Sequence, residues 1–278
     1  MSLATRLEKL DRRYLFLVIL LAVLLPLLNP LGLPIEPTPK VIGLHKAIEA
    51  LPEGSVVYFA TDWDPSAAPE LVPMAQATLR HLFRRNMKVI CGTTWPTAGP
   101  LAENVLREIG DECGKTYGED YVNLGFKEGR EVVMVSIATD IANAYPVDYH
   151  GKPTTSYPIM ADVKDFQDVA LLLNISGGYP GTKEWLQQVQ RRFGMKMGTC
   201  TTAVSEPEYV PNFQSGQLVG LVGGLAGAAE YERLIDTPGT ATRGMDAQSL
   251  GHLAIIALII VSNVAFLLRK RSGKSGPP

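Results

Sequence analysis

Residues 55–86 of this 278-residue chain read SVVYFATDWDPSAAPELVPMAQATLRHLFRRN and contain one complete unit of the fold. The first six residues are mostly apolar and rich in β-branched and aromatic side chains, which favours a buried strand. Residues 68–86 follow with apolar side chains at helical spacing, so the unit is a strand followed by a helix. The same order recurs along the chain. The five predicted strands are residues 55–60, 87–92, 131–138, 169–175 and 195–202.

Short apolar strands that alternate with helices are typical of a parallel sheet covered on both faces. The pattern therefore predicts an α/β domain with a doubly wound, mostly parallel five-stranded sheet. A helix at residues 45–51 precedes the first strand, and residues 117–129 are expected to add an edge hairpin. The helices that follow the strands are predicted at residues 68–86, 99–113, 162–168 and 182–193, with a glycine-rich helix that ends near Ile235.

Two apolar segments, residues 14–33 and 250–268, flank this domain and lack acidic and basic side chains. Each is close to the length of about 20 apolar residues that a helix needs to cross a hydrocarbon core of roughly 30 Å. We therefore expect one N-terminal and one C-terminal transmembrane helix. A cleaved signal peptide is the alternative for the first segment, but its apolar core is long and no typical cleavage site follows it.

Basic residues cluster on the outer side of both apolar segments. Of 26 Lys and Arg residues, eight lie in the terminal tails, residues 1–13 and 269–278, whereas of 28 Asp and Glu residues only Glu8 and Asp11 do. Lys and Arg near membrane spans favour the cytoplasmic side, so we expect cytoplasmic tails and a domain at residues 34–249 outside the plasma membrane. The remaining 18 basic and 26 acidic residues make that domain acidic, which argues against nucleic acid as a partner.

A third apolar stretch, residues 218–229 with the sequence LVGLVGGLAGAA, is too short to cross a membrane and is typical of a buried helix. Its small residues recur every four positions, which allows another backbone to approach closely. Packing against the domain's own sheet and contact with a second copy of the chain both fit this pattern.

Polar residues follow the predicted strands, at the edge where open α/β sheets bind their ligands. Asp, Ser and Thr are also common N-cap residues of helices, so a structural role for this rim is the alternative. The candidate ligand-binding residues are Thr93, Thr139, Asn174, Ser176, Gly177 and Thr199.

Three carboxylates on this predicted edge, Asp62, Asp64 and Asp140, form the candidate metal site. Carboxylate oxygens are ligands of Mg²⁺ and Ca²⁺, so a divalent cation is the candidate cofactor. Asp140 completes the set if the first and third predicted strands are neighbours. The same carboxylates could also divide into a nucleophile and a general acid.

Cys200 ends the fifth predicted strand and is a candidate nucleophile. A nucleophilic cysteine needs a base such as histidine within hydrogen-bond reach, and His150 is the histidine expected on the same edge. Cys200 and His150 are therefore the alternative catalytic pair. A buried cysteine that only fills space is the other interpretation.

Two loops on this edge are candidates for ligand contacts. Residues 176–183, SGGYPGTK, open a helix as a phosphate-binding loop does, although they lack the Walker order of residues. A capped glycine-rich turn is the alternative for them. Residues 141–160 form a long predicted loop rich in tyrosine and proline, which suits a lid or a partner surface.

Two functions remain open at this point. The first is a binding protein: a membrane-anchored α/β domain that takes a ligand or partner, as a homo-oligomer or with other membrane proteins in the lipid bilayer. The second is a membrane-anchored hydrolase or transferase that uses the carboxylates with a divalent cation. The sequence contains no complete catalytic constellation, which favours the first.

Overall fold

The computed structural model describes residues 12–271, which form two units. One unit is the domain at Ile35–Ala241, and the other combines the segments up to Pro34 and from Thr242 onward. Most of the two predicted tails, residues 1–13 and 269–278, lies outside the described residues. The cytoplasmic position of these tails therefore stays a prediction.

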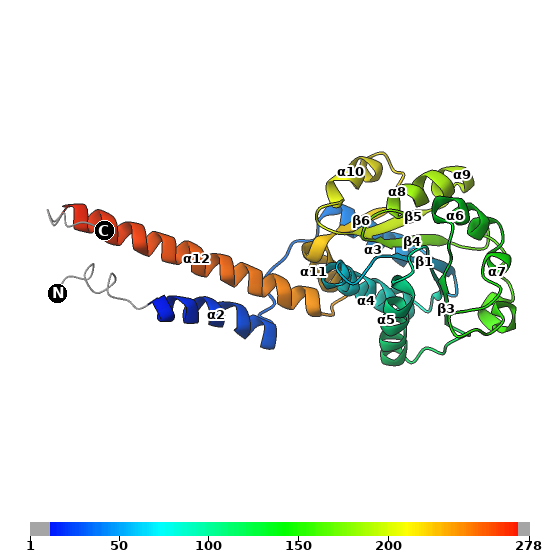
Figure 1. Ribbon diagram of the computed structural model, residues 1–278, viewed down its shortest axis with the longest axis horizontal. Helices are drawn as coiled ribbons and strands as arrows, with labels where there is room; N and C mark the ends of the chain where they lie inside the picture. The colour runs from blue at the N-terminus through cyan, green and yellow to red at the C-terminus, as the bar shows by residue number, and fades with distance from the viewer. Residues whose placement is uncertain (1–11, 272–278) are drawn as a thin grey trace. The chain divides into compact units, whose positions relative to one another are not determined.

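The domain is built on a six-stranded sheet in which neighbouring strands are parallel (Figure 1). The strand order is β3-β2-β1-β4-β5-β6, so the order reverses between β1 and β4. The strands are β1 (Val56–Asp62), β2 (Lys88–Thr93), β3 (Tyr121–Phe126), β4 (Leu171–Ser176), β5 (Met197–Thr201) and β6 (Gly220–Gly223). The predicted α/β class is confirmed and the sheet is Rossmann-like, but it has six strands instead of five.

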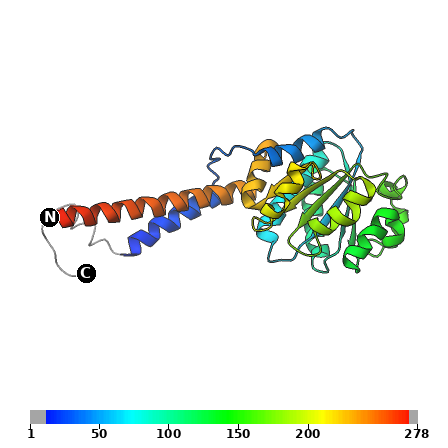
Figure 2. The same ribbon diagram turned by 90° about the horizontal axis from the view of Figure 1, so that it is seen from above.

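Helices cover both faces of the sheet (Figures 1 and 2). One layer consists of α3 (Pro39–Glu49), α4 (Ala68–Arg84), α5 (Ala98–Cys113) and α11 (Gly224–Leu234). The opposite layer consists of α6 (Arg130–Thr139), α8 (Thr182–Trp185), the π-helical turn η3 (Leu186–Gln190), α9 (Arg191–Phe193) and α10 (Glu206–Gln214).

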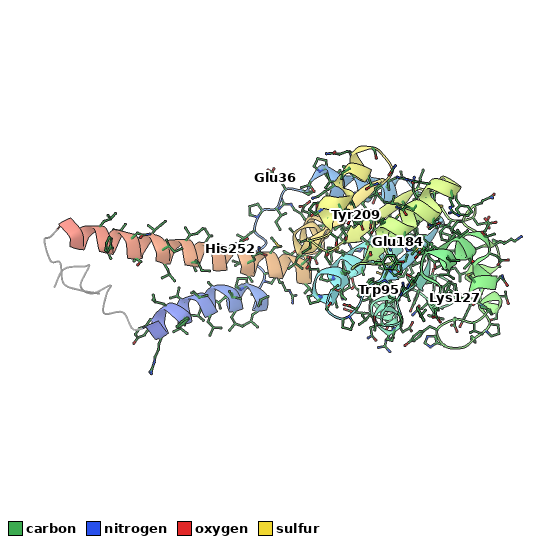
Figure 3. All side chains as sticks on the ribbon, turned by 45° about the horizontal axis from the view of Figure 1, so that its top comes forward. Glu36, Trp95, Lys127, Glu184, Tyr209 and His252 are labelled. Carbon is green, nitrogen blue, oxygen red and sulfur yellow. The ribbon has the colours of Figure 1, made fainter. Side chains whose placement is uncertain are left out.

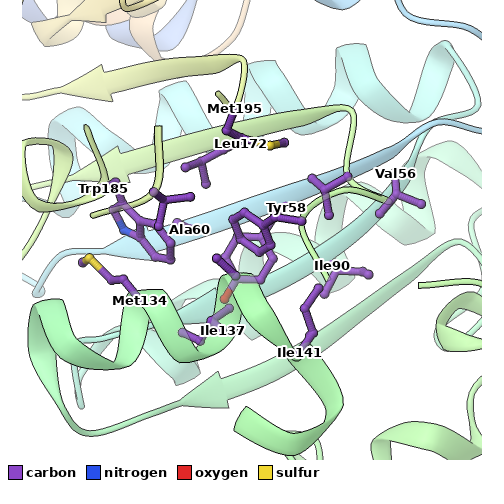
Figure 4. Packing of buried hydrophobic residues seen from close by; sticks show 14 of the residues in the cluster. Val56, Tyr58, Ala60, Ile90, Met134, Ile137, Ile141, Leu172, Trp185 and Met195 are labelled. Atoms are coloured by element: carbon purple, nitrogen blue, oxygen red, sulfur yellow. The ribbon is translucent and has the colours of Figure 1, made fainter. Parts of the chain in front are cut away.

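Strand β1 is completely buried, as expected for a central parallel strand covered on both faces. Successive side chains of a strand point to opposite faces, so Tyr58 and Ala60 lie on the same side. There they pack in one cluster with Met134 and Ile137 of α6 and with Trp185 (Figure 4). This cluster joins the sheet to the layer that contains α6.

The predicted strand at residues 131–138 is wrong, because these residues form α6. Val133, Met134, Ile137 and Ala138 are buried, and their spacing places them on one face of a helix. The β-branched residues of this segment favour a strand only weakly, and the packing of an apolar helix face overrides that preference. The third strand of the chain is β3, a parallel edge strand where an edge hairpin is predicted.

The prediction of one glycine-rich helix at residues 218–229 is also wrong, because the stretch contains β6 and the first turns of α11. Gly220 explains the strand. A Cβ atom at this position would come within 2.2 Å of Leu44 N in α3, so only glycine allows β6 to lie against α3. The small residue here serves close packing inside the domain.

The segment that follows α6 is more ordered than the long loop predicted for residues 141–160. It contains α7 (Ile141–Ala144), the 3₁₀ turns η1 (Thr154–Ser156) and η2 (Pro158–Met160), and a bridge between Val147 and Pro153. The helix predicted at residues 162–168 does not form, and turns and bends replace it.

The second unit contains the apolar helix α2 (Arg12–Leu28) and most of α12 (Thr240–Arg271). Among the described residues, only Thr240–Leu267 forms a helix long and apolar enough to cross a membrane. Helix α2 has 17 residues, and at 1.5 Å per residue it is about 26 Å long, short of a core of roughly 30 Å. It ends at Leu28 because Asn29 precedes Pro30 and is disfavoured in a helix. The structure thus supports one candidate span where two are predicted.

Within this unit, one carboxylate holds the segment after α2. Asp246 of α12 is completely buried and accepts hydrogen bonds from the backbone N–H groups of Leu31 (2.8 Å), Gly32 (2.9 Å) and Leu33 (3.0 Å). These three donors would otherwise lack partners at the end of an apolar helix, where an unpaired amide is costly.

Candidate functional site

Asp62 lies where the strand order reverses, the position at which Rossmann-like sheets bind ligands. It ends β1 opposite Ser176 of β4, and its side chain is completely buried. Oδ1 accepts hydrogen bonds from Thr94 N (2.9 Å) and Thr94 Oγ1 (2.7 Å). Oδ2 accepts hydrogen bonds from Asn174 Nδ2 (2.9 Å) and Trp185 Nε1 (2.7 Å). Asp62 therefore connects β1 to the loop after β2, to β4 and to α8.

Burial raises the pKa of Asp62 to about 6, and the hydrogen bonds from Thr94, Trp185 and Asn174 oppose this rise. Asp62 is consequently mostly ionised at neutral pH. A carboxylate has about four lone-pair positions, and donors occupy all four here. This arrangement holds chain segments together and leaves no free lone pair for a metal ion or a substrate proton.

Two of the predicted ligand residues, Asn174 and Thr199, meet in the same buried network. Thr182 Oγ1 donates to Asn174 Oδ1 (2.9 Å) and lies 2.8 Å from Thr199 Oγ1. All three side chains are fully buried. The structure thus brings Asn174 and Thr199 together, but inside the domain and away from solvent.

Two further predicted residues, Ser176 and Gly177, form the turn beside this network. Ser176 Oγ donates to Gly178 O (3.1 Å). A Cβ atom at Gly177 would lie 3.1 Å from Ala67 Cβ and 3.3 Å from Trp63 Cβ, so the turn packs closely against the loop after β1. Their contacts are therefore those of a packed turn.

The glycine-rich loop at residues 176–183 uses its polar groups internally. Gly181 N donates to the Glu184 carboxylate (2.8 Å), and Trp95 Nε1 donates to Pro180 O (2.7 Å). Trp95 and Glu184 are both labelled in Figure 3. Because a phosphate-binding loop needs free backbone N–H groups at a helix start, these contacts favour a hydrogen-bonded turn.

The remaining predicted ligand residues, Thr93 and Thr139, lie apart from the Asp62 network. Thr93 is buried at the end of β2, and its Oγ1 accepts a hydrogen bond from Trp95 N (2.9 Å). Thr139 is exposed in the last turn of α6, where its hydroxyl donates to Val135 O (2.8 Å). Both hydroxyls thus make local hydrogen bonds.

Asp64 and Asp140 each hold a local turn. Asp64 Oδ1 accepts from Ser66 Oγ (2.6 Å) and Ser66 N (2.9 Å), and these hydrogen bonds lower the pKa of Asp64. Asp140 precedes α7 and accepts from Asn143 N (2.9 Å). It follows a helix instead of a strand, so the neighbouring strands that would place it beside Asp62 do not exist. Within the part of the chain that the structure describes, the three aspartates do not form a cluster of metal ligands.

Cys200 and His150 are also separate. Cys200 is buried in β5, and burial raises the pKa of its thiol far above the usual range. His150 lies beside β3, where its Nε2 is 3.1 Å from Glu103 Oε1 and the adjacent Tyr149 N donates to Asn123 O. Strands β3 and β5 are four positions apart in the sheet, which is about 19 Å at roughly 4.8 Å per strand.

An open pocket of about 400 Å³ lies at the carboxyl end of β3. The start of α5, the end of β3 and residues 144–149 line it, with aromatic side chains from Phe126, Tyr145 and Tyr149. Gly125, at a φ of +76°, supplies the backbone conformation that turns β3 beneath Tyr149. The volume falls in the range of small-molecule sites.

Two charged residues line this pocket, Lys127 and Asp148. Burial opposes ionisation of Asp148, but hydrogen bonds from Tyr157 (2.6 Å), Lys152 N (2.7 Å) and Tyr117 (2.8 Å) outweigh it and lower its pKa. Asp148 is therefore ionised and engaged. The Lys127 ammonium group (Figure 3) has no ion-pair or hydrogen-bond partner among the described residues, so it is free to meet a ligand.

A cluster of possible metal ligands, which the sequence interpretation misses, lies in another part of the domain. His45, Glu49 and His81 offer ligand atoms that all lie within 4.8 Å of one another. His45 and Glu49 are four residues apart on α3, a spacing that puts both on one helix face and was visible in the sequence. His81 comes from α4, and only the packed structure adds it.

No protein-family model, curated protein or solved structure matches this chain. The features of the domain that bear on function are its fold, the closed Asp62 network, the open pocket at the end of β3 and the His45, Glu49 and His81 cluster.

Proposed function

We propose that this protein is a membrane-anchored binding protein whose Rossmann-like domain takes a small ligand in the pocket at the end of β3. The observation that carries the proposal is the open pocket itself, about 400 Å³ and lined largely by apolar and aromatic residues. Small-molecule sites are typically concave and mostly apolar, with a few placed polar groups. The Asp62 network, by contrast, is closed to ligands.

The lining favours a ligand that has an apolar or aromatic body and one acidic group. Phe126, Tyr145 and Tyr149 supply the aromatic contacts, and Lys127 supplies an unpaired positive charge. Helix α5 begins at the pocket without an acidic residue in its first turn. Its N-terminal dipole therefore adds positive potential at the same place.

The proposal includes a two-pass topology, with both termini in the cytoplasm and the domain outside the plasma membrane. Large apolar side chains of α2 and α12 are exposed, and a lipid bilayer would cover them. Helix α2 is short for a span, but residues 29–33 extend its apolar stretch. The excess of Lys and Arg in the tails supports the orientation. A second copy of the chain, or another membrane protein, is the expected further partner of these helices.

The alternative, a hydrolase or transferase with a metal at Asp62, Asp64 and Asp140, has less support. Asp62 has no lone pair left for an ion, and the other two carboxylates hold separate turns. Catalysis at this position would first require the Asp62 network to open.

Ligand binding is tested with the full-length protein in mild detergent. A thermal-shift screen of small carboxylates and phosphates with apolar bodies identifies a ligand, and titration calorimetry measures its affinity. Loss of the charged partner in Lys127→Gln should weaken binding at least roughly tenfold, since a hydrogen bond to a charged group contributes about 1.5–3 kcal/mol. Lys164→Gln, which changes an exposed lysine outside the pocket, should leave the affinity unchanged.

A second variant fills the pocket directly. A Cβ atom at Gly99 would meet the Tyr149 ring only at 3.5 Å, an ordinary contact, so a larger side chain there can extend into the pocket. Gly99→Phe should abolish binding while the protein stays folded. Binding that survives both Gly99→Phe and Lys127→Gln would show that the ligand lies elsewhere.

The topology is tested separately with a membrane-impermeant thiol reagent on intact cells, in a Cys113→Ser background that leaves only the buried Cys91 and Cys200. Glu128→Cys, on the exposed surface of the domain, should react in intact cells. Ser272→Cys, in the C-terminal tail, should react only after lysis. The reverse pattern would contradict the proposed orientation.

A further inference from the structure

Three side chains converge at the edge of the sheet opposite the pocket. Helix α3 leads into β1 and α4 leads into β2, so the C-terminal halves of both helices lie near the amino ends of these strands. His45, Glu49 and His81 meet there, with ligand atoms within 4.8 Å of one another. Zn²⁺ bonds of about 2.0–2.1 Å place tetrahedral ligands roughly 3.4 Å apart. Modest side-chain rotations are therefore needed, which bring the more distant atoms closer and separate His81 Nε2 from Glu49 Oε1, now 2.8 Å apart.

The three residues offer the kinds of atom that bind metals, two imidazole nitrogens and a carboxylate oxygen. Metal ligands must carry free lone pairs, and both neutral imidazole and carboxylate satisfy this condition.

A fixed outer partner already orients His81. Its Nδ1 lies 2.8 Å from the hydroxyl of Tyr231, a completely buried residue of α11, and its Nε2 lies 2.8 Å from Glu49 Oε1. When Nε2 binds an ion, the single imidazole proton must reside on Nδ1 and be donated to the Tyr231 oxygen. Metal-bound histidines almost always make such a second hydrogen bond, which fixes the tautomer and the ring orientation.

We infer that His45, Glu49 and His81 form a Zn²⁺ site with one open coordination position. Two imidazoles and a carboxylate suit Zn²⁺, whereas Mg²⁺ and Ca²⁺ prefer oxygen ligands alone. Because the Glu49 side chain is 44% exposed, water has access to the fourth position. The ion joins α3 to α4 and stabilises the folded domain by binding it. The site lies at the opposite edge from the ligand pocket and does not depend on the proposed function.

Two neighbouring features moderate the affinity. The rings of His45 and His81 are stacked, with centroids 4.6 Å apart and planes 23° apart. Ring nitrogens direct their lone pairs within the ring plane, so the half-buried His45 ring must rotate to point at the ion. Arg85 Nε also lies 3.5 Å from Glu49 Oε2, and its charge competes with the cation for that carboxylate. Removal of this charge should therefore strengthen binding.

The test uses the full-length protein in mild detergent, purified with a histidine-free tag and stripped of metal by a chelator. Competition with a chromophoric chelator measures Zn²⁺ affinity and stoichiometry, and Co²⁺ absorption in the visible range reports the geometry. We expect one ion per chain. Tyr231→Phe should weaken binding by roughly 10-fold, as for other outer-shell partners. His45→Ala and Glu49→Gln, which remove direct ligands at half-exposed positions, should weaken it more, and Arg85→Gln should tighten it severalfold.

His150→Ala is the matched control, because His150 also lies beside a glutamate, Glu103, outside the cluster. The Zn²⁺ affinity of the His150→Ala variant should equal that of the wild type. Zn²⁺ should also raise the melting temperature of the wild type and leave that of the His45→Ala, Glu49→Gln double variant unchanged. No binding by the wild type, or equal binding by the wild type and the double variant, overturns the site.

Discussion

Asp62 lies at the carboxyl edge of the sheet, where the parallel strands end, and His81 lies near the amino edge, where they begin. Both are buried polar residues that connect several elements, but their partners differ. Asp62 accepts hydrogen bonds from Thr94, Asn174 and Trp185, which are themselves buried. His81 Nε2 makes a hydrogen bond with Glu49, whose side chain is 44% exposed and can exchange this contact for water or an ion. A buried group with fixed partners holds the fold together, whereas one with a movable partner can exchange that partner for a ligand. Position at a topological switch point is therefore not enough to make a functional site.

The largest expected effect tests whether the Asp62 partners are fixed. Asp62→Ala leaves the Thr94, Asn174 and Trp185 donors buried without an acceptor, at about 1–3 kcal/mol each. We expect the free energy of unfolding, measured by urea denaturation in detergent, to fall by at least about 3 kcal/mol. Asp64→Ala, the matched change in a partly exposed turn, should cost only about 1 kcal/mol. Equal losses in the two variants would contradict the distinction between the network and the turn.

The pH dependence of the free energy of unfolding tests the environment of Asp62 while a side chain of the same size stays in place. Its folded pKa of about 6 is above its ordinary value of 3.8, so the folded state binds the proton more tightly than the unfolded state does. Acidification from pH 7 to pH 4 should therefore stabilise the wild type relative to Asp62→Asn, by about 2.4 kcal/mol. Relative destabilisation of the wild type over this range would show that the folded pKa is lowered instead.

A pair of tryptophans separates hydrogen bonding from packing at the same edge. Trp185→Phe removes a hydrogen bond to a charged group and should cost about 1.5–3 kcal/mol of unfolding free energy. Trp63 is equally buried, but its Nε1 has no hydrogen-bond partner in the described part of the chain. Trp63→Phe should therefore cost less than Trp185→Phe in thermal or urea unfolding. The opposite order would show that packing, and not the contact with Asp62, decides the stability of this edge.

The smallest effect is expected at the amino edge. Glu49→Gln keeps a hydrogen-bond acceptor for His81 and changes a half-exposed side chain, so the metal-free protein should lose less than about 1 kcal/mol. Urea denaturation in the presence of a chelator measures this change. A loss as large as that of Asp62→Ala would mean that Glu49 is a fixed structural partner and not a movable one.

The sequence predicts the fold where one pattern has no strong competitor. The continuous apolar runs at β1 and β4 are short and bounded by turn residues, which favours buried strands, and both strands form. The segment that forms α6 contains both β-branched residues, which favour a strand, and apolar residues at helical spacing. Val133 and Ile137 are four residues apart and both buried, so the helical spacing determines the structure here. The short strand β6 is not recognised from the sequence, because Gly220 is required by its close approach to Leu44 of α3, and no local pattern contains this contact.

The candidate sites are predictable only in part, for the same physical reason. The position of Asp62 at a strand end follows from the sequence. Whether hydrogen bonds occupy all the lone pairs of its carboxylate depends on Asn174 and Trp185, which are 112 and 123 residues away. The spacing of His45 and Glu49 on one helix face is a local signal, whereas His81 and Tyr231 join them only through packing of three helices. Partners that are distant in the sequence determine which buried polar group has all its lone pairs occupied and which can still bind a ligand.

The most direct test of this account is the Zn²⁺ stoichiometry of the wild type, His45→Ala and Asp64→Ala, measured side by side on the full-length protein. We predict one tightly bound ion per chain in the wild type and in Asp64→Ala, and loss of tight binding in His45→Ala. Retention of the ion by His45→Ala together with its loss from Asp64→Ala would place the metal at the carboxyl edge and contradict the account.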